Sequence, residues 1–179
     1  MVLPQTLSFA AGPLDAAPCR IGVISDTHGL LRPEALAALH GCDHILHAGD
    51  IGDERIVEQL SAIAPLSAIR GNNDLHWAKD LPDTLSVTLG SLHIWMVHDR
   101  HDRRFRLPAD AALAVVGHSH RPSLTREHGV LWLNPGSAGP RRFSLPLSVA
   151  RLEIGAGRVT ASTIPLDVAA APRRPGRLA

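Results

Sequence analysis

The chain has 179 residues, 45% hydrophobic and 20% charged, which is typical of one globular domain and excludes a largely disordered chain. No apolar run approaches the roughly 18 residues of a spanning helix, so no integral membrane protein is expected. The net charge is +1, and the body of the chain lacks the basic stripe that duplex nucleic acid requires. Two cysteines make no disulfide framework, which predicts a cytoplasmic location.

The two ends of the chain differ from its body. Residues 1–19 contain three prolines and no Lys or Arg, so they lack the basic start and unbroken apolar stretch of a secretory signal. We predict a flexible N-terminal extension over 1–19, one domain over 20–165 and a flexible basic C-terminal tail over 166–179.

The first half of the body alternates strand and helix patterns. Gly41 ends the first helix, and Pro65 follows the second. The predicted elements, in chain order, are a strand over 20–25, a helix over 33–40, a strand over 44–48, a helix over 53–63 and a strand over 66–70. This alternation is typical of parallel strands joined by helices.

The second half is almost entirely of strand type. We predict a hairpin of strands over 84–89 and 92–97 with Gly90-Ser91 at its turn, then one or two helical turns over 108–113. Further strands are predicted over 114–116, 123–127, 130–133, 148–154 and 158–164. Together the two halves predict a single α/β domain with two mixed β-sheets packed as a sandwich and helices on its outer side.

Histidine is frequent, with 11 residues, and many of these histidines follow predicted strands. The carboxyl ends of strands form the rim at which open α/β sheets bind ligands. Seven candidate metal ligands fall at such ends: Asp26, His28, Asp50, Asn72, His98, His118 and His120. Oxygen and imidazole donors without a thiolate suit Mn, Fe, Ni or Zn at a catalytic site rather than a structural zinc cage.

Each motif alone also has a structural interpretation. Asp26 could close a turn, Asp50 could cap a helix, and the Asn72–Asp74 segment could be a turn. His118 and His120 are less easily explained, because two imidazoles spaced two residues apart after an apolar strand rarely serve packing. The joint occurrence of these motifs at successive strand ends favours a functional site.

Arginines follow two of the motifs and leave two interpretations open. They could contact a substrate phosphate or form a solvated charged surface. They are Arg100, Arg103, Arg104, Arg106, Arg141 and Arg142.

Taken together, the motifs resemble those of the calcineurin-like metallophosphoesterases, and in particular the small YfcE-type phosphodiesterases. They are DTHG at 26–29, GD at 49–50, GNND at 71–74, a lone histidine at 98, GHSH at 117–120, NPGS at 134–137 and PR at 140–141. The resemblance covers about residues 20–165 and implies a two-sheet α/β sandwich with two divalent ions. Mn²⁺ is the expected ion, and Ni²⁺, Fe²⁺ and Zn²⁺ are alternatives.

The resemblance also implies how the ligands divide. It assigns one ion to Asp26, His28, Asp50 and His120. It assigns the other ion to Asp50, Asn72, His98 and His118.

The sequence departs from the family pattern at two positions. His98 is followed by Asp99 and Arg100 where the family has Gly and His, and His101 lies one place after that histidine. Asn73 stands where larger relatives have a histidine, which small YfcE-type members likewise lack. His47 could orient a metal ligand by contacting it, or it could simply be a packed or hydrogen-bonded histidine of its strand.

These residues predict a metal-dependent phosphoric ester hydrolase. We expect a phosphodiesterase that hydrolyses small phosphodiesters or nucleotides by attack of a hydroxide held between two ions bridged by Asp50. Asp50, Asn73, Asp74 and His101 are the candidate catalytic residues. A phosphomonoesterase remains an alternative, as does a noncatalytic protein-binding scaffold like the retromer subunit of this fold, and a homo-oligomer is compatible with the sequence.

Overall fold

The structure is a computed structural model that describes residues 5–10, 18–89 and 92–168. This part of the chain contains two helices, α1 (Pro33–Leu39) and α2 (Glu54–Ser61), and eleven strands. The strands are β1 (Thr6–Ala10), β2 (Cys19–Ile24), β3 (His44–His47), β4 (Leu66–Ala68), β5 (Thr84–Leu89), β6 (Leu92–Val97), β7 (Leu113–Val115), β8 (Ser123–Glu127), β9 (Val130–Asn134), β10 (Ser148–Gly155) and β11 (Arg158–Pro165).

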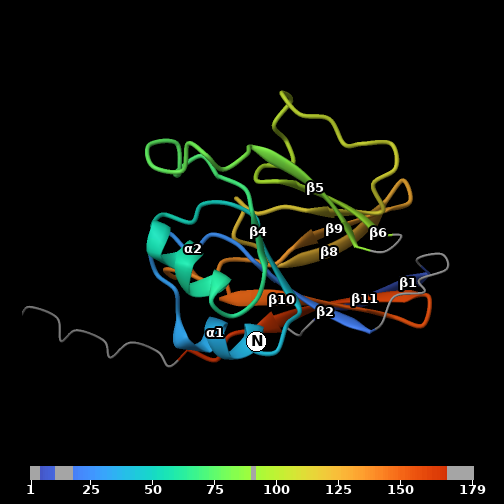
Figure 1. The fold of residues 1–179 in the computed structure, drawn as a ribbon, viewed down its shortest axis with the longest axis horizontal. Coiled ribbons are helices and arrows are strands. Elements are labelled where there is room, and N and C mark those ends of the chain that lie inside the picture. Colours follow the sequence, from blue (N-terminus) through green and yellow to red (C-terminus); the bar gives the residue numbers. More distant parts are fainter. Residues whose placement is uncertain (1–4, 11–17, 90–91, 169–179) are drawn as a thin grey trace, which may run out of the picture.

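The first sheet has six strands in the order β1-β11-β10-β2-β3-β4. Strands β2, β3 and β4 are parallel, and α1 and α2 form the two connections between them. Strands β10, β11 and β1 complete the sheet by antiparallel pairing. Both helices lie beside β2–β4, on the side away from the second sheet (Figure 1).

The second sheet has five strands in the order β5-β6-β7-β9-β8. Its inner strands β6, β7 and β9 are parallel, whereas β5 and β8 pair antiparallel at its two edges. Both sheets are therefore mixed, as predicted. The carboxyl ends of five parallel strands, β2, β3 and β4 in one sheet and β6 and β7 in the other, carry the loops that contain the candidate ligands.

The main core lies between the sheets and a second core lies under the helices. Ile21 and Val23 of β2 pack in the first core with residues such as Met96 of β6. Ile24, from the same strand, packs in the second core with Leu39 of α1. A strand buried on both faces reads as a continuous apolar run, which explains the sequence pattern at 20–25.

The predicted α/β sandwich with flanking helices is confirmed. The predicted helical turns over 108–113 are wrong, because Pro108 begins only a turn, in which the Ala111 N–H donates to the Pro108 carbonyl at 3.2 Å. The loop before this turn packs Phe105 and Leu107 on the outer face of the second sheet, against a cluster that includes Trp95. The segment therefore packs on the sheet as a loop and not as a helix.

Strand β1 lies inside the segment 1–19, for which we predicted a flexible extension. It pairs with β11, and the Ser8 and Thr160 hydroxyls are 2.9 Å apart across the pair. Gln5 also links the two sheets, since its side-chain oxygen accepts from the Leu124 N–H at 2.9 Å. The extension is therefore ordered over Thr6–Ala10, and its partner lies 152 residues later in the chain.

Other parts of the sequence predictions fall outside the described residues. These are the remainder of the extension at 1–4 and 11–17, the turn at 90–91 and the tail from 169 to 179. Within the described part, no helix is both long and apolar enough to cross a membrane.

Candidate metal centre

The loops after the parallel strands are joined to one another by backbone hydrogen bonds. The Asp26 N–H donates to the Gly49 carbonyl at 3.0 Å, and the His28 N–H donates to the Asp50 carbonyl at 2.9 Å. The two sheets are joined at the same edge, because the His118 N–H donates to Asp26 Oδ2 at 3.1 Å. Candidate ligands from both sheets therefore meet in one place.

Most of the candidate ligands have a left-handed backbone, which is uncommon for residues other than glycine. Such strain costs about 1–3 kcal/mol at each position and clusters at functional sites. Of the eight described non-glycine residues with positive φ, five are candidate ligands: Asp26 (55°), His28 (45°), Asp50 (54°), His118 (66°) and His120 (56°). All five lie in the loops at the common edge of the two sheets.

Gly117, directly before His118, is required for the close approach of the sheets. A Cβ at this position would collide with the Ser25 hydroxyl and lie 2.9 Å from Asp26 Oδ2. The Ser25 hydroxyl itself donates to Asp26 Oδ2 at 2.7 Å. One oxygen of Asp26 is thus held in place, and the other remains available.

The first group of ligands consists of Asp26, His28 and His120. Asp26 Oδ1 lies 3.2 Å from His120 Nε2 and 3.8 Å from His28 Nε2, and the two Nε2 atoms are 3.2 Å apart. Asp26 Oδ1 is fully buried without a hydrogen-bond partner. Three electron-pair donors around one point, one of them buried and unpartnered, fit a cation with bonds of about 2.1 Å.

The second group consists of Asp50, His98 and His118, with Asn72 beside it. His98 Nδ1–H donates to the Ala48 carbonyl at 2.7 Å, which leaves the lone pair on Nε2. That Nε2 atom is buried and has no hydrogen-bond partner, and it lies 3.3 Å from Asp50 Oδ2. Asn72 Oδ1 lies 3.0 Å from His118 Nδ1, a separation that suits two ligands of one ion.

Asp50 lies between the two groups. Its Oδ2 atom is 3.8 Å from His28 Nε2 in the first group and 3.3 Å from His98 Nε2 in the second. The side chain is almost completely buried. Its carboxylate is therefore placed where it can contact ions held by either group.

The surroundings of Asp50 and His28 favour the forms of these two side chains that bind metals. Burial opposes the ionisation of Asp50, but the neighbouring His98 ring and hydrogen bonds from Asn73 together hold the pKa of this carboxyl well below its usual range. Burial outweighs the attraction of Asp50 and Asp26 at His28 and lowers the pKa of this imidazole. Asp50 is thus an anion, and His28 is a neutral imidazole.

Asn73 and Asp74 both contact the loop that carries Asp50. The Asn73 backbone N–H donates to Asp50 Oδ1 at 2.9 Å, and its side-chain amide donates to Asp50 Oδ2 at 2.6 Å. Asp74 is fully buried and accepts from the backbone N–H groups of Ile51, Gly52 and Gly71 at 2.8–3.0 Å. Both Asp74 oxygens are therefore occupied in joining the loops after β3 and β4.

We expect removal of the Asp74 carboxylate to destabilise the fold and weaken metal binding together. Asp74→Ala would leave three backbone N–H groups without their acceptor, at a cost of about 1–3 kcal/mol for each buried group. Urea unfolding, with the metal content of the same sample, would measure both effects. Wild-type stability in Asp74→Ala would contradict this structural role.

His47 and His101, which the sequence singled out as further candidates, belong to neither ligand group. His47 Nδ1 accepts from the Gly49 N–H at 3.2 Å and Nε2–H donates to the Thr27 hydroxyl at 2.9 Å. Burial lowers the pKa of His47 to about 4, so it is the neutral, hydrogen-bonded strand histidine that the sequence left open. His101 is exposed, and its backbone N–H donates to Asp99 Oδ1 at 2.9 Å, so Asp99 closes the turn after His98.

Two hollows flank His118. One, of about 180 Å³, is lined by residues that include Asn72 and His98. The other, of about 300 Å³, is lined by residues that include His101 and Trp132. The second ligand group therefore opens to the surface, and His101 shares one of its two hollows.

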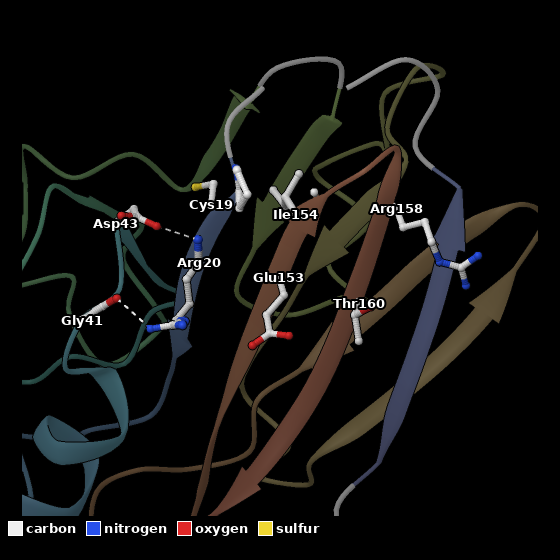
Figure 2. A pocket seen from close by; sticks show the side chains of 10 residues that line it. Cys19, Arg20, Gly41, Asp43, Glu153, Ile154, Arg158 and Thr160 are labelled. Atoms are coloured by element: carbon white, nitrogen blue, oxygen red, sulfur yellow. Dashed lines mark hydrogen bonds between the residues drawn. The ribbon is translucent and has the colours of Figure 1, made fainter. Parts of the chain in front are cut away.

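A further hollow, of about 630 Å³, lies at the opposite ends of the strands. It extends over the start of β2 and the turn between β10 and β11, where Arg20, Glu153 and Arg158 line it (Figure 2). None of its lining residues is a candidate ligand. It is separate from the metal centre.

Asn134 and Ser137 belong to the NPGS motif, from which no individual role for either residue could be predicted. The Asn134 side-chain amide donates to the Gly117 carbonyl at 2.7 Å, and the Ser137 hydroxyl donates to the Asp26 carbonyl at 2.9 Å. These two residues support the loops that carry His118 and Asp26. The NPGS motif marked these two residues in the sequence, but their contacts with the site loops could be found only in the folded structure.

Comparison with known proteins agrees with this geometry. The family model of the calcineurin-like phosphoesterase superfamily domain matches residues 19–157. A protein of Methanothermobacter thermautotrophicus named "Probable metallophosphoesterase" is 32% identical over 157 residues, which cover 80% of this chain and 91% of that protein. The chain belongs to the calcineurin-like phosphoesterase superfamily.

Solved structures share the same fold. A predicted phosphoesterase from Streptococcus pneumoniae has a TM-score of 0.65 at 26% identity, covering 88% of this chain and 95% of that chain. Vps29 of Chaetomium thermophilum has a TM-score of 0.72 at 23% identity, covering 82% and 88%. The E. coli phosphoesterase YfcE also has this fold, and the predicted resemblance to the YfcE-type family is confirmed.

Proposed function

We propose that this chain is a dinuclear-metal phosphodiesterase that hydrolyses small phosphodiesters or nucleotides. The observation that carries the proposal is the position of the Asp50 carboxylate between two ligand groups. Two ions that share a carboxylate can hold both the attacking and the leaving oxygen of an in-line displacement at phosphorus. The buried, unpartnered atoms Asp26 Oδ1 and His98 Nε2 support the presence of an ion in each group.

The residues divide between the two ions as the family resemblance implies. Asp26, His28, Asp50 and His120 would hold one ion, and Asp50, Asn72, His98 and His118 would hold the other. Two bound ions would supply the acidity that activates a water and the positive charge that stabilises the phosphoryl oxygens. We propose Mn²⁺, because an oxygen and imidazole ligand set without thiolate suits it.

The remaining site residues position this machinery. Asn73 holds both oxygens of Asp50 by its backbone and side-chain N–H groups, and Asp74 holds the loops on either side. His101 lines a hollow beside His118, from which it would face one ester group of the substrate. We propose that Asn73 and Asp74 orient ligands and that His101 contacts substrate.

The test is removal and return of the metal. Chelation should abolish hydrolysis of bis(p-nitrophenyl) phosphate, and Mn²⁺ should restore it better than Ni²⁺, Fe²⁺, Zn²⁺ or Mg²⁺. Elemental analysis of the restored protein should find two ions per chain. A single tightly held zinc without hydrolysis under any of the five metals would refute the enzyme and favour a scaffold.

We expect the reaction to depend strongly on the leaving group. Asn73 stands where larger relatives have histidine, and its amide supplies no proton to a departing oxygen. Loss of one general acid costs about 10²–10⁴-fold, so alkyl diesters should react much more slowly than aryl diesters. Rates across phenyl diesters of rising leaving-group pKa would measure this dependence.

The same series with His101→Ala tests whether His101 donates the proton instead. If the wild type shows a flat dependence that becomes steep in His101→Ala, His101 supplies the proton. If both proteins show the steep dependence, neither Asn73 nor His101 does so.

A further inference from the structure

An arginine that is not a ligand reaches the first ligand group. Arg142 Nη2 lies 3.4 Å from His28 Nε2, where it donates to the lone pair of the imidazole. The side chain is exposed, and among the described residues it forms no ion pair with an acidic group. Arg142 thus places an unneutralised charge at the mouth of the proposed metal centre.

The loop that carries Arg142 is fastened to the loop that carries Asp26. The Gly139 N–H donates to the Asp26 carbonyl at 3.2 Å, and Arg32 Nε donates to the Gly139 carbonyl at 2.9 Å. The contact is so close that a Cβ at Gly139 would collide with the Thr27 carbonyl oxygen. The backbone of the loop that carries Arg142 is therefore held next to the candidate ligands by the fold.

The backbone beside Arg142 is strained at a residue whose side chain does not pack in the core. Phe143 has a left-handed backbone with φ of 52°, and its side chain is 94% exposed. A bulky residue in this conformation costs about 1–3 kcal/mol, and such strain is found at ligand clamps. The turn closes when the Leu145 N–H donates to the Arg142 carbonyl at 3.1 Å.

The contact between Arg142 and His28 is incompatible with a bound ion. Once an ion takes the lone pair of His28 Nε2, the guanidinium loses its acceptor and faces a second positive charge. An anionic oxygen bound to this ion would give the guanidinium a new acceptor and would offset the repulsion between the two positive charges. A guanidinium forms strong, directional hydrogen bonds to phosphate. We propose that Arg142 binds a non-bridging oxygen of the substrate phosphoryl group, an inference that rests on the proposed function.

The neighbouring arginine provides a matched control. Arg141 has the same charge and is also exposed, but its Nη1 atom donates to the Leu145 carbonyl at 3.4 Å. It has no hydrogen bond to a candidate ligand among the described residues. The single substitutions Arg141→Gln and Arg142→Gln therefore each remove one positive charge, from adjacent positions of the same loop.

The experiment compares Arg142→Gln, Arg142→Lys and Arg141→Gln by calorimetric titration. Mn²⁺ alone is titrated first, and inorganic phosphate is then titrated into the Mn²⁺-loaded protein. In Arg142→Gln the dissociation constant for phosphate should rise by about 10- to 100-fold, the cost of a hydrogen bond to a charged group. Arg142→Lys should lie between this value and the wild type, because it keeps the charge but not the planar fork.

Manganese should behave in the opposite way. Without phosphate, Arg142→Gln should bind Mn²⁺ at least as tightly as the wild type, because a repulsive charge has been removed. Arg141→Gln should match the wild type in both titrations. Hydrolysis of bis(p-nitrophenyl) phosphate should follow the phosphate affinities.

Two outcomes would overturn the assignment of Arg142. Phosphate affinity equal in Arg142→Gln and wild type would show that the guanidinium does not contact the anion. Joint weakening of Mn²⁺ and phosphate would show that Arg142 only supports the loop. Failure of the wild type itself to hydrolyse phosphodiesters with any metal would instead refute the proposed function.

Discussion

Asp50→Asn should abolish measurable phosphodiesterase turnover and lower the occupancy of both metal positions. Its Oδ2 atom lies within 3.8 Å of a ligand of the first group and 3.3 Å of a ligand of the second, so one substitution weakens two sites. Asparagine removes the negative charge and replaces one oxygen by an NH2 group, which has no lone pair available for a cation. We expect turnover to fall by roughly 10³-fold or more, because metal ions contribute several kcal/mol of transition-state stabilisation.

Asp53→Asn is the matched control for this substitution. Asp53 is three residues away, caps α2 by accepting from the Arg55 N–H at 2.9 Å, and is absent from both ligand groups. Asparagine caps helices about as well as aspartate, so fold and activity should be kept. Elemental analysis and turnover, measured on both variants, decide the matter: two ions and near-normal rates in Asp50→Asn would show that this carboxylate does not bridge.

His98→Ala should remove one ion and leave the other. The His98 ring is held by its hydrogen bond to the Ala48 carbonyl, so Nε2 points at Asp50 without reorganisation. Loss of a supporting partner to a ligand alone costs 10- to 100-fold in metal affinity, so loss of the ligand should cost at least about 100-fold. Stepwise Mn²⁺ titration should show one site near the wild-type affinity and one that is much weaker.

His101→Ala tests the same loop outside the ligand groups. His101 is exposed, lies three residues later and lines a hollow beside His118 without belonging to either group. Its removal should leave two Mn²⁺ ions bound and change only the kinetics with substrate. The reverse pattern, with metal lost in His101→Ala and kept in His98→Ala, would exchange the roles of the two histidines.

The sequence by itself determined the class of the fold and the set of candidate ligands. Strand and helix periodicities depend on residues close together in the chain, so β2, α1 and β3 were predicted to within about two residues. Apolar runs that end in Asp, Asn or His marked the strand ends, and those ends form one edge of the folded domain. Even the departure at Asp99 left the position of His98 at its strand end unchanged.

Only the tertiary structure decided which groups face one another. Segments that are far apart in the sequence are joined by the pairing of β1 with β11, by the contacts of buried Asp74 with the Ile51 and Gly52 N–H groups, and by the approach of Arg142 to His28. The local sequence pattern does not predict such contacts, because the distances between these groups are set only when the two sheets pack together. The left-handed ligands are a further case, since strain of this kind persists only where the surrounding fold enforces it.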